Sequence, residues 1–240
     1  MALVSTVLID AGGVTLDGEL TVPAGAVGVV VFAHGSGSSR HSPRNGYVAG
    51  VLNAAGFATL LVDLLTRAED RSPEARFDIP LLAGRLVGLV RSVRVWPGLV
   101  GLPVGLFGAS TGAAAALVAA GAGLGHGSDT GGGPWAGRAS DPDGNPGGGR
   151  VVAGEIGAVV SRGGRPDLAG GALGQVTVPT LLIVGGRDLE VLEFNRRAAR
   201  ELGGPCEVEV VPGATHLFEE PGALARVADL AAAWFADRLR

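Results

Sequence analysis

The sequence predicts one α/β domain, spanning residues 1–240, with a mostly parallel central sheet of about eight strands and helices on both faces. Apolar runs of strand length alternate with amphipathic runs of helix length, which is the pattern of such sheets. A chain of 240 residues is long enough to bury one sizeable core. Several apolar runs end in Gly-, Ser- or Asp-containing loops, and open α/β sheets bind ligands at such strand ends.

The first half of the chain is predicted to begin with an antiparallel hairpin, in which Asp10-Ala11-Gly12-Gly13 joins strand 4–9 to strand 14–22. Apolar periodicity defines the elements after this hairpin. They are a strand at 27–33, a helix around 47–55, a strand at 58–62, a polar loop at 63–73, a helix at 82–93, a strand at 103–107 and an alanine-rich helix opening at Ser110.

Residues 121–150 interrupt this alternation, because Gly, Pro, Asp and Ser dominate them. We interpret this stretch as a flexible surface insertion, and His126 within it as a solvated side chain. The alternation then resumes. The later predictions are a strand at 156–160, a loop at 161–168, a strand at 180–184, a helix at 189–202, a strand at 207–211 and a C-terminal helix after Pro221.

Composition excludes several classes of function. The net charge is −4 without a basic block, which argues against a nucleic-acid partner. No apolar run is long enough to cross a bilayer, so we expect no membrane partner. The single cysteine, Cys206, excludes an intramolecular disulfide and fits a cytoplasmic location. One cysteine and four scattered histidines give no metal-ligand spacing, and we expect neither metal nor cofactor.

The stretch Gly108-Ala109-Ser110-Thr111-Gly112 carries the main chemical signal. It joins a predicted strand to a predicted helix, the context of a nucleophile elbow, where a tight turn exposes a serine hydroxyl. The alternative is an ordinary glycine-flanked loop serine, since the chain has 42 glycines. The strand-to-helix context favours Ser110 as a catalytic nucleophile.

A serine nucleophile needs a base, and the base needs a carboxylate that orients it. Asp188 follows strand 180–184 and His216 follows strand 207–211, so both lie just beyond strand ends. The chain order Ser110, Asp188, His216 is the one expected of α/β-hydrolases. Taken alone, Asp188 could be a turn residue and His216 a solvated loop histidine. Asp167, in the loop after strand 156–160, is a competing acid, but we favour Asp188.

An oxyanion site needs two preorganised donors. The first is predicted to be the backbone N–H of Thr111, and the second comes from the glycine- and serine-rich loop after strand 27–33. We assign Ser36 as the second donor, with Gly35 as the alternative. His34 is interpreted as a residue that holds this loop by hydrogen bonds.

With these motifs, the chain resembles α/β-hydrolases of the dienelactone hydrolase-like group. The stretches 34–45 and 161–168 resemble hydrolase modules that occur fused to phosphoribosyltransferases, although no phosphoribosyltransferase segment is present here. The resemblance implies an α/β-hydrolase fold and hydrolysis of a small ester or lactone. Dienelactone hydrolases carry a cysteine at the elbow, whereas this chain carries Ser110, so serine-type ester hydrolysis describes it better.

Four arginines are candidates for substrate binding. Arg40 and Arg44 follow the oxyanion loop, and Arg162 and Arg165 follow a neighbouring strand, so their guanidinium groups could favour an anionic substrate. The alternative is that they pair with carboxylates such as Asp167. Two other functions stay open for the scaffold: acyl transfer or cleavage of a different acyl bond, and a non-catalytic regulatory role.

Overall fold

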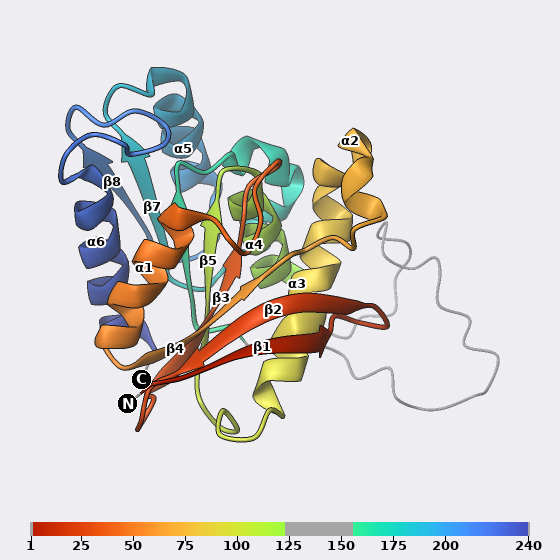
Figure 1. The fold of residues 1–240 in the computed structure, drawn as a ribbon. Helices are drawn as coiled ribbons and strands as arrows, with labels where there is room; N and C mark the ends of the chain where they lie inside the picture. The colour runs from red at the N-terminus through yellow and green to blue at the C-terminus, as the bar shows by residue number, and fades with distance from the viewer. Residues whose placement is uncertain (1, 123–155, 240) are drawn as a thin grey trace.

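The structure is a computed structural model in which residues 2–122 and 156–239 are described. Eight strands form one sheet in the order β1-β2-β4-β3-β5-β6-β7-β8 (Figure 1). Neighbouring strands from β4 to β8 in this order run parallel, whereas β2 pairs antiparallel with both β1 and β4. The strands are β1 Leu3–Asp10, β2 Thr15–Val22, β3 Gly28–Ala33, β4 Phe57–Val62, β5 Val104–Ala109, β6 Ala158–Arg162, β7 Thr180–Gly185 and β8 Cys206–Val211.

Helices cover both faces of the sheet. On one face α1 packs beside α6, and on the other α3 packs beside α4 (Figure 1). Within the described residues, no helix is both long and apolar enough to span a membrane. The helices are α1 Pro43–Ala54, α2 Pro73–Arg76, α3 Ile79–Arg94, α4 Thr111–Gly121, α5 Leu189–Glu201 and α6 Ala223–Arg238, with 3₁₀ segments η1 Glu69–Arg71 and η3 Pro166–Gln175.

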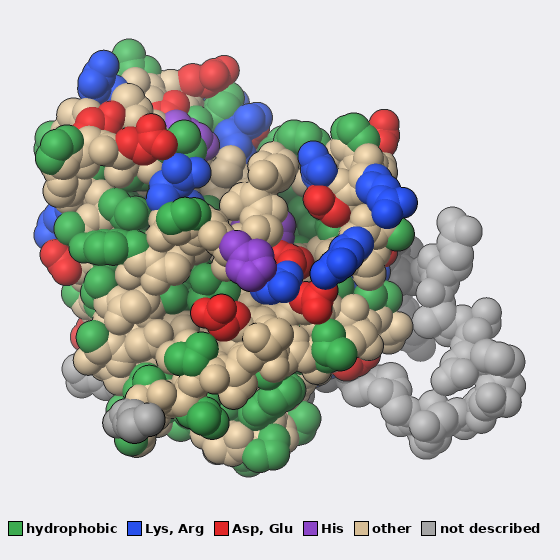
Figure 2. All heavy atoms as spheres, in the orientation of Figure 1, with side chains coloured by type: hydrophobic (Ala, Val, Ile, Leu, Met, Phe, Trp, Pro, Cys, Tyr) green, Lys and Arg blue, Asp and Glu red, His purple; other side chains and the backbone are tan. Residues whose placement is uncertain are grey.

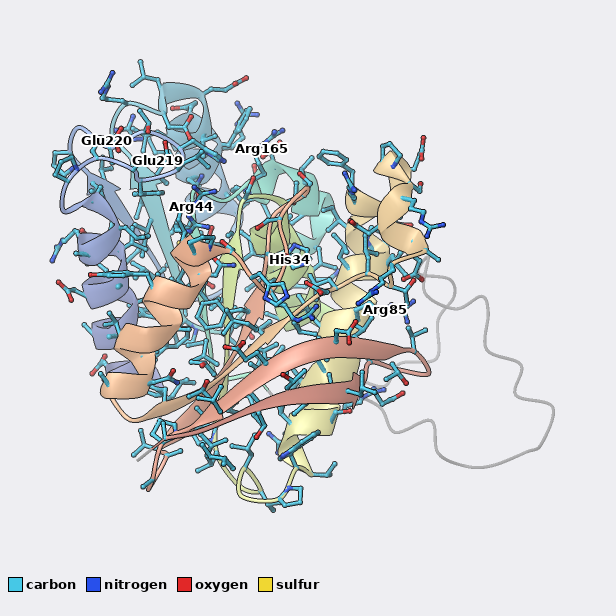
Figure 3. The ribbon with its side chains drawn as sticks, viewed as in Figure 1. His34, Arg44, Arg85, Arg165, Glu219 and Glu220 are labelled. Atoms are coloured by element: carbon cyan, nitrogen blue, oxygen red, sulfur yellow. The ribbon has the colours of Figure 1, made fainter. Side chains whose placement is uncertain are left out.

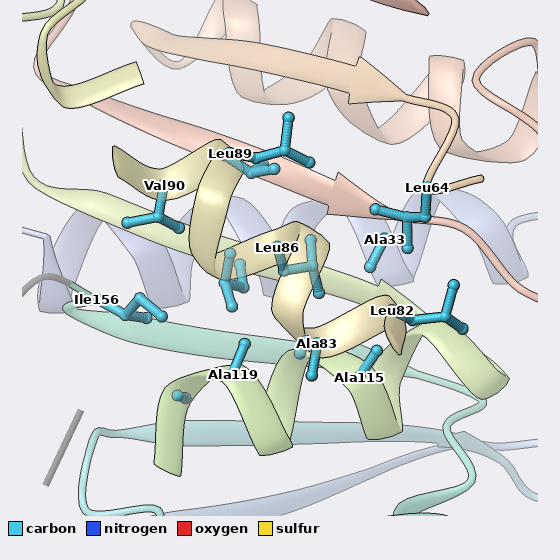
Figure 4. Packing of buried hydrophobic residues seen from close by; sticks show 14 of the residues in the cluster. Ala33, Leu64, Leu82, Ala83, Leu86, Leu89, Val90, Ala115, Ala119 and Ile156 are labelled. Atoms are coloured by element: carbon cyan, nitrogen blue, oxygen red, sulfur yellow. The ribbon is translucent and has the colours of Figure 1, made fainter. Parts of the chain in front are cut away.

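Helix α4 is the most deeply placed helix, since each of its residues is buried. Its alanines, including Ala115 and Ala119, pack against leucines of α3 such as Leu82 and Leu86 (Figure 4). Small side chains let a helix approach its neighbours closely. This close packing fixes the start of α4, and therefore the residue that precedes it, relative to the sheet.

The parallel arrangement brings several loops to one edge of the sheet. The segments that follow β3, β5, β6, β7 and β8 all leave from the carboxyl ends of their strands. The pairing of Ala109 with Arg162 sets the ends of β5 and β6 level. Residues from distant parts of the sequence therefore meet along this edge, which is where α/β sheets bind ligands.

Both ends of the described chain lie beside the amino ends of the parallel strands, opposite the carboxyl ends where the loops meet. Leu3 pairs with Val22 at the end of β2, which runs antiparallel to β4. Leu239 packs close to Gly105 and Gly157, at the amino ends of β5 and β6. The labelled ends of the chain lie at this edge in Figure 1.

The predicted architecture is confirmed, including the antiparallel hairpin at the sheet edge. The polar loop predicted at 63–73 is partly wrong, because it contains η1 and leads directly into α2. The loop after β6 likewise continues into η3, which the sequence analysis did not predict. These segments are short and rich in Gly, Pro or charge, so they lack a periodic apolar pattern. Most of the predicted insertion at 121–150, including His126, lies outside the described residues.

Candidate active site

Ser110 occupies a strained turn between β5 and α4. Its backbone has φ 52° and ψ −121°, a conformation that residues other than glycine rarely adopt. A Cβ on Gly108 would lie 2.4 Å from the Ala113 Cα, and a Cβ on Gly112 would lie 2.3 Å from the Ala33 carbonyl oxygen. Only glycine fits at these two positions, which explains the Gly-x-Ser-x-Gly pattern.

Main-chain hydrogen bonds hold Ser110 against the end of β6. The Ser110 N–H donates to the Arg162 carbonyl oxygen at 3.2 Å, and the Arg165 N–H donates to the Ser110 carbonyl oxygen at 3.1 Å. Gly35 approaches from the loop after β3, where a Cβ would lie 3.0 Å from the Ser110 Cβ. The serine is therefore enclosed by the segments that follow β3 and β6.

Asp188 and His216 meet beyond the ends of β7 and β8. The Asp188 Oδ2 lies 2.7 Å from the His216 Nδ1, so in a neutral ring Nδ1 carries the proton and Nε2 is left as an acceptor. Asp188 is the N-cap residue of α5, yet its side chain makes no capping hydrogen bond. Its carboxylate therefore accepts a hydrogen bond from the imidazole and none from the backbone N–H groups at the start of α5.

The competing acid, Asp167, has a different partner. The Arg165 guanidinium donates to it through Nε at 2.8 Å and through a terminal nitrogen at 2.7 Å. The hydrogen bond with Asp167 raises the pKa of Arg165. Asp167 is thus held by the arginine two residues before it, while Asp188 contacts the histidine.

The loop that carries His216 is tightly held. The Thr215 N–H donates to both carboxylate oxygens of Glu220 at 3.1 Å, and hydrogen bonds with Thr215 lower the pKa of Glu220. Phe218 is buried with φ 56°, in the left-handed region. Gly163 faces the ring, because a Cβ there would lie 3.5 Å from the His216 Cε1. These contacts limit the positions that the imidazole can take.

Thr111 and Ser36, the two predicted oxyanion donors, are in direct contact. The Ser36 N–H donates to the Thr111 hydroxyl oxygen at 2.7 Å. Thr111 is the first residue of α4 and is buried. The sequence analysis missed this role of the threonine side chain, for which a hydroxyl directly after the serine was the only signal.

His34 holds the loop after β3 by hydrogen bonds, as the sequence predicted. Its Nε2 accepts a hydrogen bond from the Leu64 N–H at 3.2 Å, so Nδ1 carries the proton and donates to the Gly35 carbonyl oxygen at 2.9 Å. A cavity of about 100 Å³ lies beside this ring, lined by residues of β2, the oxyanion loop and the segment after β4. The ring therefore links the loop to the start of the segment after β4.

The four candidate arginines have different surroundings. Arg40 pairs with Asp63 through its backbone N–H and its guanidinium, and Arg165 pairs with Asp167. Arg44 contacts Glu219 at 3.2 Å, whereas Arg162 donates to the neutral amide oxygen of Asn45 at 3.2 Å.

Figure 3 shows Arg44 at the top of α1 below Glu219, with Arg165 on the other side of β5. Basic and acidic side chains are interspersed along this edge of the molecule (Figure 2). Asn45, which sequence reasoning missed, carries no motif signal beyond following Arg44.

Metal-binding residues do not gather in the part of the chain that the structure describes. Residues 2–122 and 156–239 contain no group of three or more His, Cys, Asp or Glu side chains that could hold a metal ion. Ser110, His216 and Asp188 place a hydroxyl, an imidazole and a carboxylate at the strand ends.

Comparisons with known proteins place this chain among hydrolases in fold and sequence. No protein-family model matches it. Two curated Mycobacterium tuberculosis proteins, provisionally named phosphoribosyl transferases, are 55% identical over 233 residues and 97% of this chain. The chain spans only 46% of their length.

Solved structures match over the whole chain. Est1E from Butyrivibrio proteoclasticus has a TM-score of 0.71 at 14% identity over 97% of this chain and 98% of that one, a likeness of fold alone. A dienelactone hydrolase from Anabaena variabilis has a TM-score of 0.84 at 48% identity, covering 100% of this chain and 99% of that one. Identity at this level over nearly the full span of both chains shows common ancestry, and this chain therefore belongs to the dienelactone hydrolase family of α/β-hydrolases.

Proposed function

We propose that this protein is a serine hydrolase that cleaves the ester or lactone bond of a small carboxylic ester. The observation that carries the proposal is the 2.7 Å contact between Asp188 and His216, at the same sheet edge as the strained Ser110. Three residue types needed for acyl transfer thus lie beyond the carboxyl ends of β5, β7 and β8. Family membership supports hydrolysis, since the Anabaena relative is a dienelactone hydrolase.

In the proposed cycle, the Ser110 Oγ attacks the ester carbonyl carbon while the His216 Nε2 takes the hydroxyl proton. The Asp188 carboxylate accepts the Nδ1–H and stabilises the imidazolium that forms. The carbon–oxygen bond to the leaving group breaks, and His216 returns the proton to the departing alcohol. Water then attacks the acyl-enzyme with His216 as base, which releases the acid and regenerates Ser110.

Backbone donors would stabilise the oxyanion that develops in each attack. The Thr111 N–H stands at the positive end of α4, directly after the nucleophile. The second donor comes from the loop after β3, at Ser36 or Gly35. The contact between the Ser36 N–H and the Thr111 hydroxyl holds this loop beside the elbow, but it occupies the Ser36 donor and therefore favours Gly35.

The identity of the nucleophile distinguishes serine chemistry from thiolate chemistry. Ser110 stands at the elbow, and the only cysteine, Cys206, lies on β8. Burial, and then the nearby Glu207, raise the pKa of the Cys206 thiol to about 11, which disfavours a thiolate. Serine-type ester hydrolysis therefore fits this chain better than thiolate chemistry.

Labelling with a fluorophosphonate probe tests the proposal, with Ser110→Ala as the control. We expect the folded wild-type protein to be labelled and the variant to stay unlabelled. On a panel of aryl esters of varied acyl length and charge, Ser110→Ala and His216→Ala should each lower kcat by a factor on the order of 10⁶. Either variant keeping most of the activity would exclude the triad.

The same experiment separates the two alternatives. Labelling without turnover in water would favour acyl transfer to another acceptor. A folded wild-type protein that takes no label would favour a non-catalytic module.

A further inference from the structure

Arg162 is a buried cation without an anionic partner among the described residues. Only 7% of its surface is exposed, its Nε has no hydrogen-bond partner, and the one contact of its guanidinium is with the neutral amide of Asn45. Arginine is almost never buried this deeply unless it is paired, because removal of a charge from water is costly. The residue therefore needs an explanation that the fold alone does not supply.

Arg44 makes this burial more costly. It lies close enough to Arg162 that, after burial itself, its charge is the second cause that lowers the pKa of Arg162, to about 10. The Arg44 Nε is also buried without a partner. Arg162 also contacts Asn45, the residue after Arg44, so two guanidinium groups of like charge lie near the start of α1.

The backbone of Arg162 lies beside the nucleophile. The carbonyl oxygen of Arg162 accepts the Ser110 N–H, and Arg44 stands in the first turn of α1, which follows the oxyanion loop. The first turn of α1 contains no acidic residue. The positive end of this helix dipole therefore adds to the charge of the two arginines.

Glu219 is a weak partner in this site. Within residues 2–122 and 156–239 its one ion pair is with Arg44, at 3.2 Å, and its side chain is 65% exposed. Exposed ion pairs of this kind contribute little to stability. A bound anion could displace Glu219 at little cost, because its carboxylate would return to water.

We propose that Arg44, Arg162 and the N-terminus of α1 form a subsite for a phosphate group carried by the ester substrate. The proposal rests on the proposed ester hydrolysis and adds the substrate class. Two guanidinium groups and a helix N-terminus match the charge of a dianion, and arginine binds phosphate oxygens in a bidentate manner. Arg40 and Arg165 do not belong to the subsite, because Asp63 and Asp167 already neutralise them.

The subsite is tested first without catalysis, by calorimetric titration of inorganic phosphate into the Ser110→Ala protein. Combining Ser110→Ala with Arg162→Met, or with Arg44→Gln, should weaken phosphate binding at least tenfold. Arg94→Met is the matched control: it removes the same charge from the exposed end of α3, at the opposite edge of the sheet, and should leave binding unchanged. If Arg162→Met does not fold, the more exposed Arg44→Gln decides alone. Absence of phosphate binding, or equal binding by all variants, would overturn the subsite.

Turnover then separates this proposal from the proposed function. Two matched aryl esters are compared, one with a phosphate on its acyl chain and one with a hydroxyl at that position. We expect the wild type to prefer the phosphorylated ester at least tenfold in kcat/KM, and Arg44→Gln to remove most of that preference. A third ester with a carboxylate at the same position should show a smaller preference; an equal or larger one would overturn the assignment to phosphate. Turnover of neutral esters without any preference refutes the subsite alone, whereas failure on all esters refutes ester hydrolysis.

Discussion

The backbone N–H of Ser36 donates a 2.7 Å hydrogen bond to the side-chain hydroxyl of Thr111, 75 residues along the chain. This contact joins the loop after β3 to the first turn of α4. Thr111 therefore contributes in two ways. Its backbone N–H, at the start of α4, is the first proposed oxyanion donor, and its hydroxyl holds the loop that carries the second proposed donor.

Replacement of Thr111 by valine should lower kcat about tenfold to a hundredfold with a smaller effect on KM. Valine keeps the shape but removes the acceptor of the Ser36 N–H, which frees the loop that carries the second proposed donor, and a misplaced oxyanion donor costs up to about 10²–10³ in kcat. Steady-state kinetics on an aryl acetate provide the measurement. Thr111→Ser keeps the hydroxyl and should stay close to wild type; a valine variant with undiminished kcat would contradict the coupling.

Asp188→Asn should lower kcat by about 10⁴, because the amide no longer fixes the His216 tautomer or stabilises the imidazolium. Asp167→Asn is the matched control, since its carboxylate is bound by Arg165. Its effect on kcat should be within a few fold. The two variants are compared through kcat against pH, and a reversed order of effects would assign the acid to Asp167.

Glu69 should make folding stability depend on pH. Burial raises its pKa, but hydrogen bonds from the Thr66 N–H and hydroxyl, together with Arg85, outweigh burial and lower the pKa below its ordinary value of 4.5. A lowered folded-state pKa means that the contribution is present above pH 4.5 and is lost as pH falls through the folded-state pKa.

Glu69→Gln should therefore lower the free energy of unfolding by about 0.5–1.5 kcal/mol at pH 7, because solvent screens this partly exposed group, and by progressively less below pH 4.5. Urea denaturation at several pH values gives the measurement. Arg85→Met in the same background completes a double-mutant cycle, and the two losses should not add, because Arg85 contacts Glu69 at 2.8 Å. A pH-independent difference would exclude this assignment.

Two glycines of α3 provide a matched pair for stability. A Cβ on Gly88 would lie 2.3 Å from the carbonyl carbon of Ala11, in the hairpin turn, whereas a Cβ on Gly84 would meet nothing within 4 Å. Gly88→Ala should destabilise the protein by at least about 2 kcal/mol. Gly84→Ala should stabilise it by about 0.4–1 kcal/mol, because alanine favours the helix. Thermal melts of both variants test the close approach of α3 to the hairpin.

Apolar periodicity was sufficient to predict the sheet, the main helices and the position of Ser110 between β5 and α4. The segments η1, α2 and η3 escaped prediction, because short pieces rich in Gly, Pro or charge bury too little to show a period. The carboxylate partners of the arginines at the site could not be predicted from the sequence either. Arg44 and Glu219 are 175 residues apart in sequence, so only the folded chain decides which arginine receives a carboxylate and which does not.

The two ends of the described chain lie at the sheet edge opposite Ser110. In relatives about twice as long as this chain, a second domain joined at either end would be tethered on the far side of the sheet from the elbow. The point of attachment of such a domain would be separated from Ser110 by the length of the strands. The same geometry makes either terminus suitable for an affinity tag or a surface anchor, and turnover by the immobilised protein should match turnover in free solution.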